Sequence, residues 1–145
     1  MSFLSSMDIS ASALTAQRMR MDVISENIAN ADTTRTANGG PYRRRVVEMA
    51  EQPLSFSAAL KQATGNGVTG GGVAVSRIVE DASDFEYEYN PSHPDADENG
   101  YVAKPNVDIA EEIIDMMSAT RSYEANVTAL NATKGMAMKA LEIGR

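Results

Sequence analysis

Apolar residues recur every seven positions near the start of the chain, in a stretch without Gly or Pro. The repeating positions are Met7, Leu14, Met21 and Ile28, and Leu4, Ala11 and Ile24 flank them. Such a repeat places the side chains in one narrow stripe of the coiled-coil type. The pattern predicts a long helix over residues 3–31, which ends before Thr33-Thr34 and the turn Asn38-Gly39-Gly40-Pro41.

A second seven-residue repeat near the end of the chain predicts a helix over residues 107–143. The repeating positions are Ile109, Met116, Tyr123, Leu130 and Ala137, with Ile113, Val127 and Leu141 beside them. Pro105 blocks extension of this helix toward the N-terminus. Either Asn106 or Asp108 is placed to cap it.

Between the two helices the period changes to that of strands. The alternation from Phe85 to Tyr89 predicts a half-buried strand. The other expected elements are strands within residues 42–49, 73–79 and 101–102, a short helix over 55–63 and a Gly-rich connector over 64–72. We expect the core of this middle part to come from Val73, Val75, Phe85, Tyr87 and Tyr89.

The sequence therefore predicts an α+β fold in three segments. Residues 1–34 and 106–145 supply the two helices of a coiled-coil-like core domain, and residues 35–105 form a small β-rich middle domain. The composition, 43% hydrophobic with nine Met and no Trp, suits helix–helix contacts. Each long helix keeps flanks that neighbouring molecules can cover.

The formal net charge of −7 repels nucleic acid and anionic lipid at long range. No stretch approaches the ~20 apolar residues of a membrane span. Residues 1–8 lack the cationic and apolar regions of a secretory signal. We expect no nucleic-acid partner and no direct membrane insertion, and either a cytoplasmic location or export without a cleaved signal peptide.

Two short motifs match chemical sites but lack the context that those sites need. Residues 65–70 match G-x-G-x-x-G, but they follow an expected helix and precede an expected strand, the reverse of a nucleotide-binding turn. Residues 95–100 match the first half of an EF-hand calcium loop, but its last ligand position holds Asn106 in place of Glu, and Pro91 and Pro94 preclude the incoming helix. We interpret the first motif as a linker and the second as a polar turn, and we expect no cofactor.

His93 is the one His in a chain without Cys, which cannot begin an ordinary transition-metal site. We expect it to be a turn residue that hydrogen-bonds the backbone. No nucleophile elbow accompanies the Ser and Asp residues. The sequence predicts no catalytic residue and no metal site, and hence a protein that is not an enzyme.

Charges of opposite sign are segregated in the middle part. Arg43-Arg44-Arg45 form a basic cluster, whereas residues 78–103 hold eight acidic residues and no Lys or Arg. Docking between neighbouring subunits and a solvated strand face both account for this pattern.

The segment Asn27-Ile28-Ala29-Asn30-Ala31-Asp32-Thr33-Thr34 resembles the N-I/L-A-N-x-x-T signature of the flagellar rod and hook family of axial proteins. The resemblance continues, in order, through residues 39–44, 93–97, 100–102, 105–107 and 119–126, so it spans nearly the whole chain. It implies a structural subunit of the proximal rod, the drive shaft of the flagellar basal body that crosses the periplasm and transmits torque.

The resemblance also implies the partners. These are other rod proteins, the adaptor protein at the rod base, further copies of the chain, and the flagellar type III export apparatus. The terminal helices are expected to form the inner core of the tube. The expected assembly interface comprises Met7, Leu14, Met21, Asn27, Ile28, Asn30, Ile109, Ile113, Met116, Tyr123, Asn126, Val127, Leu130 and Leu141.

The two asparagines of the signature stand at the end of the first helix, where amides can bond orphan carbonyls or a neighbour's backbone. The alternative hypothesis is a soluble binding module whose helices form a dimeric coiled coil. Sedimentation would then show a fixed dimer with folded ends.

Overall fold

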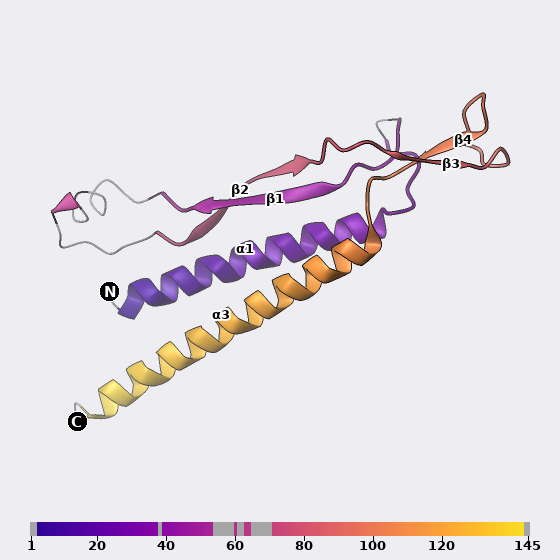
Figure 1. Ribbon diagram of the computed structural model, residues 1–145. Helices are drawn as coiled ribbons and strands as arrows, with labels where there is room; N and C mark the ends of the chain where they lie inside the picture. Colours follow the sequence, from indigo (N-terminus) through magenta and orange to yellow (C-terminus); the bar gives the residue numbers. More distant parts are fainter. Residues whose placement is uncertain (1–2, 38, 54–59, 61–62, 65–70, 144–145) are drawn as a thin grey trace.

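The computed structural model describes residues 3–37, 39–53, 60, 63–64 and 71–143 (Figure 1). Its elements are α1 (Phe3–Ala29), β1 (Arg45–Glu51), β2 (Val73–Glu80), β3 (Glu86–Tyr89), β4 (Tyr101–Lys104) and α3 (Ile109–Ile143). The predicted α+β class is confirmed, with helices at both ends and two small antiparallel sheets between them. The connector motif at 65–70 and most of the expected helix over 55–63 lie outside the described residues.

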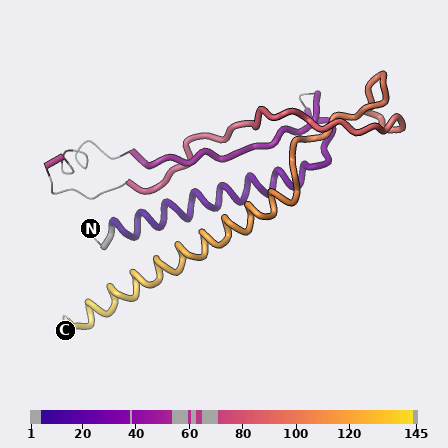
Figure 2. Tube along the Cα trace, in the orientation of Figure 1, coloured from indigo at the N-terminus to yellow at the C-terminus, as the bar shows by residue number. Residues whose placement is uncertain are grey.

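The two helices lie side by side and run in opposite directions, and the chain path in Figure 2 shows them closest where α1 ends and α3 begins. Arg20 of α1 donates to Asp115 of α3 at 3.1 Å. The Thr120 hydroxyl lies 3.6 Å from the Met21 sulfur. Ala119 is fully buried, and its small side chain allows the two backbones to approach closely.

On its other side, α1 packs against a ribbon formed by β1 and β2 (Figure 1). The strands pair antiparallel from Arg45 opposite Glu80 to Glu51 opposite Val73, with a bulge between Glu48 and Met49. A two-stranded ribbon is marginal alone, so α1 supplies the surface that it needs. α1 is thus the middle layer of three, between the ribbon and α3.

This middle position explains why α1 has two apolar faces where the seven-residue repeat predicted one. Met21 lies on the α3 side, whereas Ala16 and Val23 are buried although neither belongs to the predicted stripe. Ala11, expected beside the stripe, is exposed. The repeat identified the helix-facing side and missed the ribbon-facing side.

Within the single chain, the predicted stripe on α3 is covered only in its middle. Met116, Tyr123, Leu130 and Ala137 are half-buried, but Ile109, Ile113 and Leu141 are exposed. A straight helix drifts by about 20° per heptad from a 3.5-residue repeat, so one heptad line cannot follow a straight partner from end to end. The exposed members remain available to neighbouring molecules.

The prediction that β3 contributes side chains to the core of the middle domain is wrong. All four residues of this strand are exposed, including Tyr87 and Tyr89, so it is not the half-buried strand predicted. β3 pairs with β4, and among the described elements no helix packs on either strand. Alternation correctly predicted a strand, but it carries no information about what covers the strand.

Gly72 joins the connector to the ribbon at a point where only glycine fits. Its φ is +93°, and an added Cβ would collide with the Ser12 hydroxyl of α1. That hydroxyl donates to the Ile9 carbonyl at 2.7 Å and accepts the Val73 N–H at 3.1 Å, which ties β2 to α1. Gly72 therefore has a packing function as well as a turn function.

We expect Gly72→Ala to lower the free energy of unfolding by about 2 kcal/mol, because it combines a positive φ with displacement of Ser12. Urea unfolding followed by circular dichroism measures the change. Gly40→Ala is the matched control, since its φ is ordinary and an added Cβ meets nothing within 4 Å. Equal stability of the two variants would contradict this account of Gly72.

Candidate functional site

Asn27, near the end of α1, makes four hydrogen bonds from a side chain that is only 1% exposed. Its Nδ2 donates to the Arg45 carbonyl at 2.9 Å and to Glu112 Oε2 at 3.0 Å. Its Oδ1 accepts from the Tyr42 hydroxyl at 2.9 Å and from the Arg45 N–H at 3.0 Å. Two donated and two accepted bonds are what a primary amide offers, so neither Asp nor Leu can replace it without loss.

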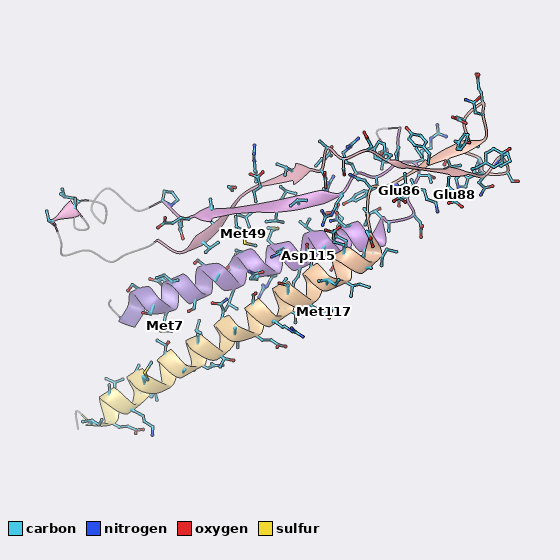
Figure 3. All side chains as sticks on the ribbon, in the orientation of Figure 1. Met7, Met49, Glu86, Glu88, Asp115 and Met117 are labelled. Atoms are coloured by element: carbon cyan, nitrogen blue, oxygen red, sulfur yellow. The ribbon has the colours of Figure 1, made fainter. Side chains whose placement is uncertain are left out.

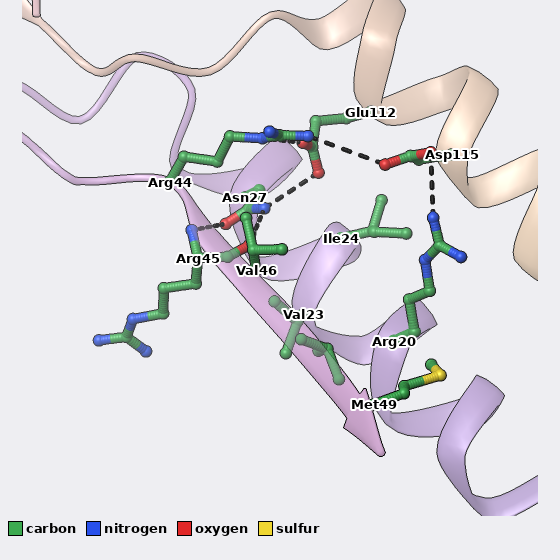
Figure 4. A pocket seen from close by; sticks show the side chains of 11 residues that line it. Arg20, Val23, Ile24, Asn27, Arg44, Arg45, Val46, Met49, Glu112 and Asp115 are labelled. Atoms are coloured by element: carbon green, nitrogen blue, oxygen red, sulfur yellow. Dashed lines mark hydrogen bonds and ion pairs between the residues drawn. The ribbon is translucent and has the colours of Figure 1, made fainter. Parts of the chain in front are cut away.

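Glu112 lies opposite Asn27, in the first turns of α3, and is also 1% exposed. Its Oε1 accepts from Arg44 Nε at 2.6 Å, and its Oε2 accepts from Asn27 (Figure 4). Both oxygens face donors, which requires a carboxylate in place of an amide. Arg44 and Asn27 together compensate the cost of burying this charge.

Arg44 connects Glu112 to two more carboxylates. Its guanidinium lies 3.6 Å from Asp81 and 3.8 Å from Asp115, in addition to the contact with Glu112. Burial alone would lower the pKa of Arg44, but the hydrogen bond and the charge of Glu112 outweigh it and the pKa is raised. Arg44 therefore stays charged and holds the start of β1 against α3.

The Arg44 backbone is held by Asn106, whose Oδ1 accepts the Arg44 N–H at 2.8 Å. Asn106 Nδ2 donates to Ser83 Oγ at 2.7 Å. The Ser83 N–H donates to Asp81 at 3.0 Å, and this bond is the main reason that the pKa of Asp81 is lowered, with the Arg44 charge acting in the same direction. Asn106 thus bridges segments and is not the helix cap.

The cap of α3 is Asp108, the other candidate. Its Oδ1 accepts the Ala110 N–H at 2.8 Å and the Glu111 N–H at 3.4 Å. These bonds satisfy two of the free donors at the start of the helix. The sequence-based prediction of a cap at this point is confirmed.

Tyr42 completes the junction from the turn before β1. The ring is buried, and its hydroxyl donates to Asn27. Burial raises the pKa of Tyr42, and the nearby Glu26 charge raises it further, so the hydroxyl keeps the proton that it donates. The Arg45 guanidinium lies 5.8 Å from the ring centroid and 2.8 Å from Glu26.

We call this set, Asn27, Tyr42, Arg44, Asn106 and Glu112, the junction network. It joins the end of α1, the start of β1 and the start of α3, which are far apart in sequence. A cleft of about 300 Å³ opens beside it, lined by apolar residues such as Val23 and Ile24 and by the charged groups of Figure 4. No group of three or more His, Cys, Asp or Glu among the described residues is arranged to hold a metal ion. The arrangement fixes the relative placement of three segments; it offers no activated nucleophile.

The three arginines of the basic cluster are all engaged within the chain. Arg43 donates to the backbone carbonyls of Asp81 at 2.8 Å and Ser83 at 3.0 Å, and its guanidinium lies 4.3 Å from the Phe85 ring centroid. Arg44 belongs to the junction network, and the Arg45 guanidinium pairs with Glu26 at 2.8 Å. Neither subunit docking nor a solvated strand face is needed to explain these residues.

Of the predicted interface residues, only Asn27 is part of the junction network. Asn30 instead closes the end of α1: its Nδ2 donates to the Glu26 carbonyl at 2.9 Å, and its Oδ1 accepts from the Thr33 hydroxyl at 3.2 Å. The Glu26 carbonyl also accepts the Asn30 backbone N–H at 3.1 Å, so this bond does not fill the role expected for these amides, which was to bond an orphan carbonyl or a neighbour's backbone. Asn126 makes a local bond, from its Nδ2 to the Ser122 carbonyl at 2.8 Å.

The sequence reasoning missed Glu112, Tyr42 and Arg44 as one buried group. In the sequence, Glu112 looks like its neighbour Glu111, an acidic residue near the start of a helix. The family resemblance pointed to three of these residues, because the matching segments 27–34 and 39–44 contain Asn27, Tyr42 and Arg44. Pairing them with Glu112 needs the fold.

The turn at residues 93–100 behaves as a polar turn. His93 Nδ1 accepts the Asp95 N–H at 3.1 Å, which confirms His93 as a turn residue that bonds the backbone. Asp97 Oδ1 accepts the N–H groups of Asn99 at 2.9 Å and Tyr101 at 2.8 Å. Asp95 accepts from the Thr34 hydroxyl at 2.9 Å and from Arg35 at 3.3 Å, so its carboxylate ties the turn to the loop that follows α1.

We expect added Ca²⁺ to bind no more tightly than millimolar, because the carboxylates of Asp95 and Asp97 already accept protein hydrogen bonds and the last ligand position is Asn106. Calorimetric titration of the full chain is the measurement. Submillimolar binding that disappears in Asp95→Ala would contradict the expectation.

Comparison with known proteins gives family matches at both ends of the chain. A family model for flagella basal body rod proteins matches residues 7–35, and one for the C-terminal part of flagellar basal body rod FlgEFG proteins matches residues 98–143. These two matches cover most of α1 and all of α3, and they define the class, the rod proteins of the flagellar basal body.

Relatives of full length identify the family within this class. The chain is 59% identical to the flagellar basal-body rod protein FlgC of Bacillus subtilis, with 97% of each chain covered. It is 45% identical to FlgC of Borreliella burgdorferi (99% of this chain and 98% of the relative) and 41% identical to FlgC of Salmonella typhimurium (100% of both). The chain belongs to the FlgC family of flagellar basal-body rod proteins.

Proposed function

We propose that the chain is a structural subunit of the flagellar rod that works by packing its helices against neighbouring subunits, and that it catalyses no reaction. The observation that carries this is the half-covered state of α3. One side meets α1, while large apolar side chains on other sides are exposed: Ile109, Ile113, Ile114, Met117, Met136, Met138, Leu141 and Ile143. Exposed apolar residues in this number indicate surfaces that are covered on assembly.

The predicted interface residues other than the three asparagines divide into two groups under this proposal. Met7, Leu14, Met21, Ile28, Met116, Tyr123, Val127 and Leu130 are half-buried, and they hold the helix pair together while contributing their exposed edges to neighbours. Ile109, Ile113 and Leu141 are exposed and serve neighbours alone. Contacts that do not close on themselves then build a helical tube.

The core domain in this proposal consists of the helices within residues 1–34 and 106–145, and the middle domain lies outside the tube. The rod crosses the periplasm, and the subunit reaches it through the flagellar type III export apparatus without a cleaved signal. Its partners are the other rod proteins, the adaptor at the rod base and further copies of itself. The family membership and the exposed apolar surface of α3 support these statements. In the described part of the chain, no helix has the combined length and apolarity of a membrane span.

The test replaces the Bacillus subtilis relative with this chain in that bacterium. We expect swimming to be restored and the chain to be recovered in purified basal bodies by mass spectrometry. A chain that is expressed but absent from basal bodies, while swimming stays lost, would contradict the proposal. Recovery as a free dimer would favour the soluble coiled-coil module.

A further inference from the structure

The turn between β3 and β4 is closed by an imidazole at a position where turns ordinarily carry Asp, Asn or Ser. The His93 carbonyl accepts the Ala96 N–H at 3.1 Å, so residues 93–96 form a β-turn with Pro94 in its second position. An Asp or Asn at the first position of such a turn accepts the N–H two residues on with a side-chain oxygen. His93 does this with a ring nitrogen, because its Nδ1 accepts the Asp95 N–H at 3.1 Å.

This bond fixes the protonation state of the His93 ring. A ring nitrogen that accepts a hydrogen bond carries no proton, so the ring that closes the turn is neutral, with its proton on Nε2. An imidazolium donates from both nitrogens and has no acceptor left. Pro94 has no N–H, so Asp95 supplies the first backbone donor after His93. Protonation of the ring therefore removes the bond, whereas an oxygen acceptor in the same place keeps it.

Charges of both signs surround the ring. Glu88 of β3, labelled in Figure 3, is close enough for the charge of His93 to lower its pKa, although the hydrogen bond from Lys104 of β4 lowers that pKa most. Asp95 lies in the turn itself, and its carboxylate pairs with Arg35 from the loop that follows α1 at 3.3 Å. The carboxylates attract an imidazolium, which offsets the lost hydrogen bond. Protonation thus exchanges an oriented bond for a charge attraction that does not depend on the turn.

The bond to the Asp95 N–H has consequences beyond the turn, because Asp95 connects two parts of the molecule. Its carboxylate accepts from the Thr34 hydroxyl at 2.9 Å and from Arg35, both in the loop that follows α1. The Asp95 side chain is 22% exposed, so these contacts are largely shielded from solvent. When the Asp95 N–H loses its acceptor, the backbone that aims this carboxylate is no longer held. The connection between the β3–β4 hairpin and the loop then weakens.

We propose that His93 is a pH-sensitive switch: its neutral ring closes the turn and holds Asp95 against Thr34 and Arg35, and its protonation opens the turn and loosens this connection. The direction follows from the accepted bond, since only the neutral ring can accept. The turn is therefore closed above the ordinary titration range of histidine, about pH 6.5, and open below it.

Amide hydrogen exchange of the purified, isotope-labelled full chain tests the switch between about pH 5 and about pH 8, the range in which histidine titrates. Each rate is corrected for the intrinsic pH dependence of exchange. We expect the corrected rate of the Asp95 N–H to rise about fivefold as His93 becomes protonated, which is the change in open population that one hydrogen bond controls. The ring nitrogen signals should show a proton on Nε2 alone at the upper end of the range and on both nitrogens at the lower end.

His93→Asn is the matched control, because Asn before Pro favours the same turn, its side-chain oxygen accepts the same N–H, and it does not titrate. We expect the corrected Asp95 rate to stay slow at every pH in this variant and fast at every pH in His93→Ala. The unsubstituted chain should match the Asn variant at the upper end and the Ala variant at the lower end. A corrected rate that does not change with pH in the unsubstituted chain, or a proton on Nδ1 at the upper end, overturns the inference. An Asn variant whose rate changes with pH as the unsubstituted chain does also overturns it.

Discussion

In the variant Glu112→Ala we expect the free energy of unfolding to fall by about 3–5 kcal/mol, a large share of the 5–15 kcal/mol typical of a domain. The substitution removes the carboxylate that accepts from Arg44 at 2.6 Å and from Asn27 at 3.0 Å. Arg44 is then left half-buried without its closest partner, and one amide N–H of Asn27 loses its acceptor. Asp81 and Asp115 lie farther away and compensate only in part. Urea unfolding of the full chain, followed by circular dichroism, is the measurement.

Glu111→Ala is the matched control, because it removes the same charge from the neighbouring, exposed position. Its effect should stay within about 0.5 kcal/mol. Glu112→Gln should fall between the two, since an amide offers one acceptor where the junction has two donors. If the alanine variants at 111 and 112 unfold at the same urea concentration, the junction network does not stabilise the chain.

The two long helices were predictable because their apolar repeats are long and uninterrupted. The boundaries differ from those of the structure by only two residues at the end of α1 and at the start of α3. What the repeat could not show is how many partners each helix has. Ala16 and Val23 lie off the α1 repeat and are buried by the ribbon, whose packing position depends on the fold.

All four expected strand segments overlap strands of the structure, β1 to β4. Alternation in β3 was read as burial of the tyrosines, which is wrong. The face that the sequence assigned to a core is the face that the fold leaves exposed. Alternation of polar and apolar residues shows that the two faces of a strand differ. Whether another element packs on either face depends on the fold.

The junction network was predictable only in fragments. Asn27 was assigned to the end of a helix, where its amide would bond an orphan carbonyl or a neighbour's backbone. Within the chain it bonds the backbone of Arg45 and the side chains of Tyr42 and Glu112 instead. The link to Glu112 spans 85 positions in sequence and depends on how α3 crosses α1. Local rules describe Glu112 and Glu111 alike, as acidic residues near a helix start, although one is buried and the other exposed.

The variant Leu130→Asp should fold and yet fail to join a rod. Leu130 is half-buried on the side of α3 that carries Tyr123 and Ala137, and lies far along the helix from the junction network. A carboxylate there costs about 1–3 kcal/mol when the seam closes around it. The ribbon, held by Ser12 and Val73, and the junction at the other end of α1 do not contact this position.

In the replacement strain, cells carrying only Leu130→Asp should be non-motile and lack hooks and filaments, because distal parts are built on the rod. The purified variant should remain soluble and keep its strand signal by circular dichroism. Thr128→Asp, which adds the same charge at an exposed polar position nearby, is the control and should swim. Normal swimming of Leu130→Asp would show that this seam is not used in assembly. Loss of all folded structure in the purified variant would show instead that the helix pair is the core of the free molecule, because the ribbon and the junction would then depend on a side chain at the distant end of α3.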